Sequence, residues 1–138
     1  MPGPPNPAKT LLIIHRVYLV VVVVLTFLGE YLHSAGPAMN PIFSAAVAVC
    51  AVIDAGLAFF IRQKFSAAAL EVLRADPANV AALGRWRLGQ FAPMVMAVSV
   101  ALFGFVLRFL GAPLPQAALF YVGSIVLLLY FRPSDPVA

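Results

Sequence analysis

Four long apolar segments, separated by short polar connections, constrain the fold of this chain more than any motif does. The first three hold about twenty residues each, which at a rise of ~1.5 Å per residue is enough to cross the ~30 Å hydrocarbon core of a bilayer. The fourth is shorter and needs Pro115 and Gln116 at its rim. The pattern predicts an all-α integral membrane protein, an antiparallel four-helix bundle made of two helical hairpins. The segments are residues 11–32, 41–61, 88–107 and 115–131.

The composition excludes most soluble classes of protein. Apolar residues make up 63% and charged residues 10% of the 138 residues, which leaves too little polar surface to solvate a globule. A soluble helical domain would carry amphipathic stripes, whereas these segments are apolar all round. The net charge of +4 does not indicate nucleic-acid binding, because the basic residues are scattered along the segment ends and form no patch with interleaved aromatic residues. Anionic membrane lipids are the expected partners of these side chains.

The basic residues also indicate the orientation of the segments. All but Arg108 lie near the start of the first segment, between the second and the third, or after the fourth. By the positive-inside rule, both termini and the connection 62–87 then lie in the cytoplasm, and the expected location is a bacterial inner membrane. The outer connections, residues 34–40 and 111–116, are short and rich in Gly and Pro. Each is therefore expected to join two antiparallel helices.

The regions outside the four segments have simple predicted structures. Residues 1–9 are rich in proline and are predicted to form a disordered lead, and residues 133–138 form a short tail. The connection 62–87 is predicted to form two helical extensions, because strong helix formers flank a central break. At that break Asp76 is the predicted N-cap and Pro77 the first residue of the restarted helix.

A tryptophan stands between two arginines just before the third segment. Arg85, Trp86 and Arg87 are predicted to anchor the helix at the interface, with the indole in the headgroup layer and the guanidinium groups facing phosphates. A protein-docking surface is the alternative interpretation. Cys50 is the single cysteine and lies inside the second segment, so it is interpreted as a small packing residue.

Asp54 is the most costly residue inside the apolar segments. A carboxylate at the centre of a membrane helix is unfavourable by ~2.5–3.5 kcal/mol on insertion scales, so Asp54 should be protonated, paired or turned toward protein. Arg16, Tyr18 and Ser124 are expected at a similar depth and are its predicted partners in a buried polar contact. An ion pathway that uses Asp54 as a proton site is the alternative, although the outer half of the membrane offers little beyond Glu30 and one serine.

His15 and His33 are candidate ligands for the metal of a haem or chlorophyll. They are five helical turns apart, so they share a helix face and lie near opposite membrane boundaries, ~27 Å from each other. A bis-histidine haem needs two ligands at one depth, which here requires a second subunit. No cofactor and no metal site are therefore predicted. Both rings are otherwise interpreted as interfacial side chains, with Glu30 placed to pair with His33.

Small residues at helical spacing predict close helix packing on two segments. One series lies on the second segment and the other on the third, where Pro93 should also kink the helix. Tight contact between these two segments is the expected consequence. The series are Ala51, Ala55 and Ala58, and Gly89, Pro93, Ala97 and Ala101.

Residues 97–107, with Phe103-Gly104 followed by Phe-Val-Leu, resemble the carboxylate-bearing helix of the rotor subunit c family of F-type and V-type ATPases. The position that matches the ion-binding carboxylate of that family is Val98, so the resemblance does not imply ion binding. The chain as a whole resembles a family of small four-span bacterial membrane proteins. Arg-Trp-Arg-x-Gly at 85–89 and Ala-Leu-Phe-Gly-x-Val-Leu-Arg-Phe-Leu-Gly at 101–111 carry this resemblance, which implies the same four-span fold.

The sequence indicates no enzyme, because it has no His and Cys cluster, no glycine-rich phosphate loop and no nucleophile elbow. Two classes of function remain. The first is a noncatalytic accessory or structural subunit of a larger membrane complex, in contact with other subunits or with further copies of itself. The second is a small ion-pathway, transport or tetrapyrrole-binding protein that uses Asp54, His15 or His33.

Overall fold

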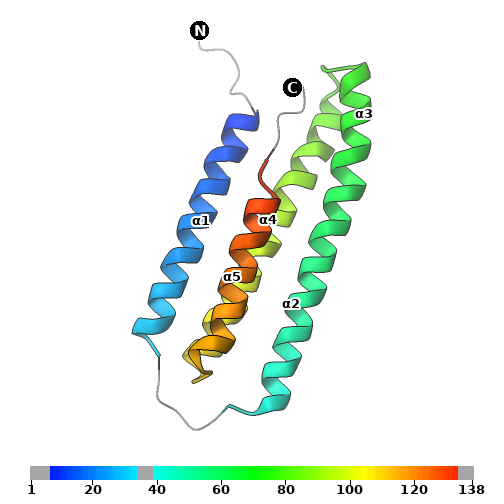
Figure 1. Cartoon of the computed structure of the whole chain (residues 1–138). Helices are drawn as coiled ribbons and strands as arrows, with labels where there is room; N and C mark the ends of the chain where they lie inside the picture. Colours follow the sequence, from blue (N-terminus) through cyan, green and yellow to red (C-terminus); the bar gives the residue numbers. More distant parts are fainter. Residues whose placement is uncertain (1–6, 34–38, 134–138) are drawn as a thin grey trace.

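The computed structural model describes residues 7–33 and 39–133, and in this part of the chain it contains helices and no strands. The all-α prediction is confirmed. The chain direction reverses from α1 to α2, from α3 to α4 and from α4 to α5 (Figure 1). The start of α1, α3 and the end of α5 share one end of the molecule (Figure 1). The elements are α1 (Pro7–Tyr31), α2 (Pro41–Ile61), the π-helix η1 (Arg62–Ala67), α3 (Ala68–Ala75), α4 (Val80–Phe109) and α5 (Leu114–Tyr130).

Three helical stretches are long and apolar enough to cross a membrane, namely Ala8–Tyr31, Pro41–Ala75 and Val80–Phe109. The second is one continuous helix of 35 residues that joins α2, η1 and α3. α5 is apolar but has only 17 residues. At the usual rise it is about 26 Å long, slightly less than the ~30 Å hydrocarbon core.

α4 is the central helix of the fold, and it contacts α1, α2, α3 and α5. α1 and α5 also pack against each other, so α1, α4 and α5 form a three-helix group. Within the described residues, α2 packs mainly on α4, and its backbone makes few close approaches to α1 or α5. One apolar cluster nevertheless contains buried residues of all four long helices, including Val22 of α1, Ala58 of α2, Ala97 of α4 and Leu128 of α5. α4 can lie at the centre of this arrangement because it carries small residues that allow close approach from several sides.

The helix ends differ from the sequence predictions at two places. α1 begins at Pro7, so residues 7–9 are helical, while the rest of the predicted lead lies outside the described residues. Asn79, and not Asp76, is the N-cap of α4, and its Oδ1 accepts a hydrogen bond from the backbone N–H of Ala82 at 2.9 Å. Asp76 Oδ1 instead accepts from the N–H of Ala78 at 3.1 Å. The predicted N-cap was wrong because the carboxylate of Asp76 is already bound within the turn that precedes α4.

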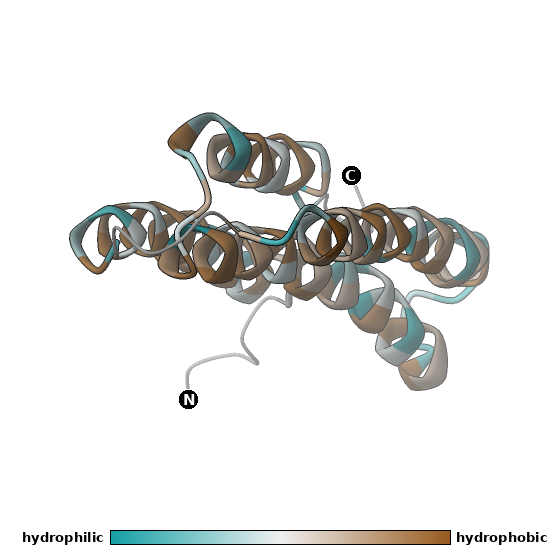
Figure 2. Cartoon of the chain, turned by 90° about the horizontal axis from the view of Figure 1, so that it is seen from below, coloured by the Kyte–Doolittle hydropathy of each residue, from teal (hydrophilic) through white to brown (hydrophobic). Residues whose placement is uncertain are grey.

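Large apolar side chains cover the outside of the helices. Phe27 on α1, Val52 on α2 and Leu119 on α5 are 72%, 72% and 74% exposed. Figure 2 shows apolar residues along all of the helices, interrupted by shorter hydrophilic stretches. Such an extensive apolar surface is unusual for a protein in water. Residues 34–38 of the first outer connection lie outside the described residues. Residues 134–138 of the predicted tail also lie outside them.

Candidate functional site: polar contacts between the helices

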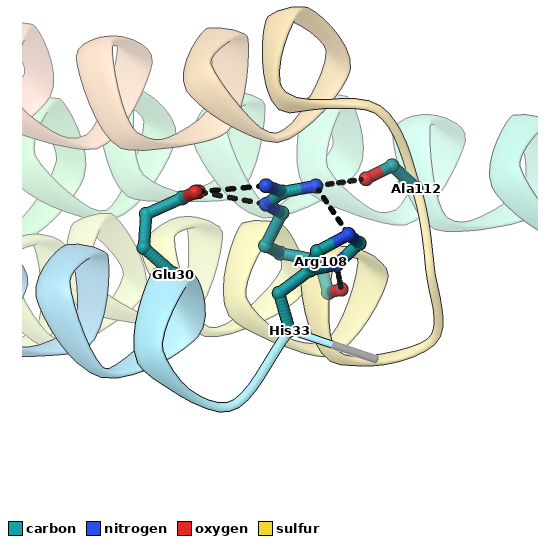
Figure 3. Close-up of polar contacts among 4 residues, drawn as sticks. All are labelled: Glu30, His33, Arg108 and Ala112. Atoms are coloured by element: carbon teal, nitrogen blue, oxygen red, sulfur yellow. Dashed lines mark hydrogen bonds and ion pairs between the residues drawn. The ribbon is translucent and has the colours of Figure 1, made fainter. Parts of the chain in front are cut away.

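The most extensive polar cluster joins the ends of α1 and α4 (Figure 3). Arg108 Nε and Nη2 donate hydrogen bonds to the two carboxylate oxygens of Glu30 at 2.7 and 2.8 Å. Arg108 Nη1 donates to the carbonyl oxygen of Ala112 at 2.9 Å. Two parallel N–H···O bonds give an Arg–carboxylate pair its strongest geometry. The pair therefore fastens α1 to α4 and to the turn that precedes α5.

His33 belongs to the same cluster. Its Nδ1 donates to the carbonyl oxygen of Arg108 at 3.2 Å, and its Nε2 accepts from Arg108 Nη1 at 3.4 Å. In these two contacts Nδ1 is the donor and Nε2 is the acceptor. The predicted pairing of Glu30 with His33 was wrong, because both side chains bind Arg108 instead (Figure 3). Sequence reasoning missed Arg108 as a site residue, although it was the one basic residue on the predicted outer side.

His15 and Ser124 make two further contacts between helices. His15 is buried and its Nε2 donates to the carbonyl oxygen of Leu128 at 2.8 Å, which joins α1 to α5. Leu128 lies in the last turn of α5, where carbonyl groups lack an intrahelical donor. Ser124 is fully buried and its hydroxyl donates to the carbonyl oxygen of Ala97 at 2.5 Å, which joins α5 to α4. Both polar side chains thus satisfy backbone groups of a neighbouring helix.

Asp54 on α2 is half-buried and accepts a hydrogen bond from the hydroxyl of Ser99 on α4. The predicted contacts with Arg16, Tyr18 and Ser124 were wrong. The physical reason is the helix arrangement, since α2 packs on α4 and not extensively on α1 or α5. Arg16 is exposed, and the ring of Tyr18 packs against a phenylalanine ring of α4 with centroids 6.2 Å apart.

Trp86 is fully buried, in the same apolar cluster as Leu73 and Ala82. The prediction that its indole lies in the headgroup layer was wrong, because α3 packs against the start of α4 and the indole belongs to the core that they form. Arg85 and Arg87 are exposed. Helix geometry places the immediate neighbours of a buried residue on other faces of the helix.

The small residues of α4 lie where neighbouring segments approach most closely. A Cβ atom added at Gly89 would lie 2.7 Å from the backbone nitrogen of Ser66 in η1. A Cβ atom added at Gly104 would lie 2.7 Å from the Cβ of Phe120 in α5. The close contacts therefore involve η1 and α5 as well as α2. In the two predicted series Ala51, Ala58, Gly89, Pro93, Ala97 and Ala101 are buried, and Ala55 is half-buried.

Among residues 7–33 and 39–133, no three His, Cys, Asp or Glu side chains gather in a group able to hold a metal ion. Comparison of the chain with protein-family models, with curated proteins and with solved structures finds no match. The resemblances carried by residues 85–89 and 97–111 stay predictions.

Proposed function

We propose that the chain is an integral membrane protein in which α1, α2, α4 and α5 cross the bilayer as antiparallel helices. The length and apolar character of three of its helices support this, as do the large apolar side chains exposed along α1, α2 and α5. The end of the molecule that carries α3 lies on the cytoplasmic face in this proposal. Anionic headgroups and the positive-inside rule favour that side for exposed basic residues. The exposed basic residues at this end include Lys9, Lys64, Arg74, Arg85, Arg87 and Arg132.

We further propose a noncatalytic role, as an accessory or structural subunit of a larger membrane complex. The observation that carries this proposal is that the side chains considered for an ion pathway or a cofactor contact other parts of the chain and hold the helices together. A proton pathway needs polar groups in contact with water, and a tetrapyrrole metal must reach an imidazole nitrogen, whereas His15 is buried. The contacts are those of Glu30 and His33 with Arg108, of His15 with Leu128, of Asp54 with Ser99 and of Ser124 with Ala97.

An apolar groove between α2 and α5 is the proposed site for a helix of another subunit. The groove has a volume of 460 Å³ and lies over Val100 of α4. Its walls include the small residues Ala48 and Ala55 on α2 and Gly123 on α5. Small residues let helices approach closely in lipid, where van der Waals packing replaces the hydrophobic effect as the driving force.

A matched pair of glycine variants tests the accessory role. Gly123 lines the groove and Gly56 does not, and a Cβ atom at either position meets nothing within 4 Å. Gly123→Leu and Gly56→Leu should therefore both fold. Purification from native membranes in mild detergent should recover stoichiometric membrane partners with the unaltered chain and with Gly56→Leu, but not with Gly123→Leu. Recovery of no partner at all, or equal recovery with both variants, contradicts the proposal.

The ion-pathway alternative predicts a different result for Asp54. Asp54→Asn keeps an acceptor for Ser99 but has no proton to release at neutral pH. We expect this variant to leave partner recovery unchanged and to alter no pH-driven flux in proteoliposomes. A proton-dependent flux that the unaltered chain supports and Asp54→Asn abolishes would favour the pathway instead.

A further inference from the structure

A cavity with both polar and apolar walls lies where α2 continues into η1, at the end of the molecule that we place on the cytoplasmic side. Its volume is 320 Å³, several times the ~30 Å³ that one water molecule occupies in the liquid. Arg62 and Ser66 of η1 line it together with Gln90 of α4, and Phe59 and Tyr130 add aromatic walls. π-helical segments such as η1 occur frequently at functional sites.

Gln90 supplies a hydrogen-bonding group that the protein leaves unused. The side chain is 2% exposed, and its Nε2 donates to the hydroxyl oxygen of Ser66 at 2.7 Å. Its Oε1 is buried and has no hydrogen-bond partner among the described residues. A buried amide oxygen normally has a partner, because the water lost on burial must be replaced. Gln90 is one of the residues that line the cavity, and a rotation of its amide group presents this oxygen to a ligand that carries a hydrogen-bond donor.

Arg62 supplies a positive charge that no described carboxylate pairs with, since the ion pair among the described residues is between Arg108 and Glu30, at the opposite end of the molecule. Its Nη1 and Nη2 donate to the carbonyl oxygens of Tyr130 and Arg132 at 3.3 and 3.4 Å. The guanidinium carbon lies 5.9 Å from the centre of the Tyr130 ring. These contacts hold the guanidinium group in place, and a guanidinium has five N–H donors, so several stay available for an anion.

We propose that this cavity binds the headgroup of an anionic glycerophospholipid that carries free hydroxyl groups, such as phosphatidylglycerol. The phosphate pairs with Arg62, a headgroup hydroxyl donates to Gln90 Oε1, and the glycerol backbone lies against Phe59. Phosphatidylcholine fits less well, because its headgroup has no hydrogen-bond donor. Basic pockets between membrane helices on the cytoplasmic side are known to suit anionic headgroups. The inference rests on the membrane location proposed above.

Native mass spectrometry of the full chain in mild detergent tests the inference. The protein is equilibrated with phosphatidylglycerol, with phosphatidylcholine or with glycerol 3-phosphate, and retention is compared. We expect phosphatidylglycerol to be retained up to about tenfold better than phosphatidylcholine, the largest difference that the neutral hydrogen bond from the headgroup hydroxyl to Gln90 Oε1 can supply. Arg62→Gln and Gln90→Glu should each remove this preference. Arg62→Lys should keep part of it, and Arg87→Gln, which removes an exposed charge outside the cavity, should keep all of it.

Equal retention of the two lipids overturns the inference. A preference for phosphatidylglycerol that survives both Arg62→Gln and Gln90→Glu also overturns it, provided that the helical circular dichroism of these variants is unchanged. Retention of glycerol 3-phosphate as strong as that of phosphatidylglycerol assigns the cavity to a soluble phosphate ester and overturns the lipid as its source. These outcomes are distinct from a failure of the membrane proposal. A chain that fractionates without detergent as a soluble monomer contradicts that earlier proposal, whereas detergent-extracted protein without lipid preference contradicts only the cavity.

Discussion

Arg108 offers the sharpest test of how this fold is held together. It binds Glu30 through two hydrogen bonds and also contacts Ala112 and His33. Arg108→Met removes all of these contacts with a side chain of similar length. Glu30→Gln removes only the charge of the carboxylate and keeps an acceptor. The two variants and their combination form a double-mutant cycle that isolates the pair.

The expected magnitudes follow from the exposure of the two side chains, which is 11% for Arg108 and 37% for Glu30. Exposed ion pairs contribute ~0.2–1 kcal/mol, whereas removal of one partner from a buried pair costs ~3–5 kcal/mol. This pair lies between the two limits. We expect Arg108→Met to lower the free energy of unfolding by ~3 kcal/mol and Glu30→Gln by ~1–2 kcal/mol. The double variant should be no less stable than Arg108→Met, which corresponds to a coupling of ~1–2 kcal/mol.

Unfolding of the purified protein in mixed micelles of dodecyl maltoside and dodecyl sulfate, followed by circular dichroism, measures these free energies. Arg87→Met is the matched control, because Arg87 is exposed on the same helix and its loss should change stability by less than ~0.5 kcal/mol. Additive effects of the two variants, within ~0.3–0.5 kcal/mol, would refute the reasoning. They would mean that the contact between Arg108 and Glu30 contributes nothing of its own.

Three further predictions concern packing and burial. Gly104→Ala should lower stability by ~1–3 kcal/mol through overpacking. Gly84→Ala is the control and should not lower it, because a Cβ atom there meets nothing within 4 Å. Equal thermal unfolding midpoints of the two variants would contradict the close approach of α4 and α5. Ser124→Ala should cost ~0.5–1.7 kcal/mol, the range for hydrogen bonds between membrane helices, as measured by the same mixed-micelle unfolding. Trp86 is the single tryptophan, and because it is buried its fluorescence should be blue-shifted and should resist quenching by bromine-labelled lipids. Strong quenching would mean that the indole lies in the headgroup layer.

The helical segments could be predicted from the sequence because the length of an apolar run depends only on helix rise and bilayer thickness. The predicted segment 41–61 coincides with α2, and 115–131 lies within one residue of α5 at both ends. The helix break at residues 76–79 was also expected, although its capping residue was not. The predicted N-cap was Asp76, whereas the N-cap in the structure is Asn79.

The polar contacts could not be predicted in the same way. The partner of Asp54 depends on which helix lies beside α2, and depth along the bilayer normal carries no information about lateral neighbours. Ser99 is therefore its partner, and not Tyr18. The burial of Trp86 likewise depends on the packing of α3 against α4, which the pattern of basic residues around it does not reveal.

The orientation of the chain in a membrane is the central claim, and single-cysteine labelling tests it most directly. Cys50 is exposed and is first replaced by serine. Arg74→Cys then marks α3, and Leu114→Cys marks the start of α5 at the opposite end of the molecule. A membrane-impermeant maleimide applied to intact cells should label Leu114→Cys at once and Arg74→Cys only after permeabilisation. Labelling of Arg74→Cys from outside, or equal labelling of both, would contradict the account.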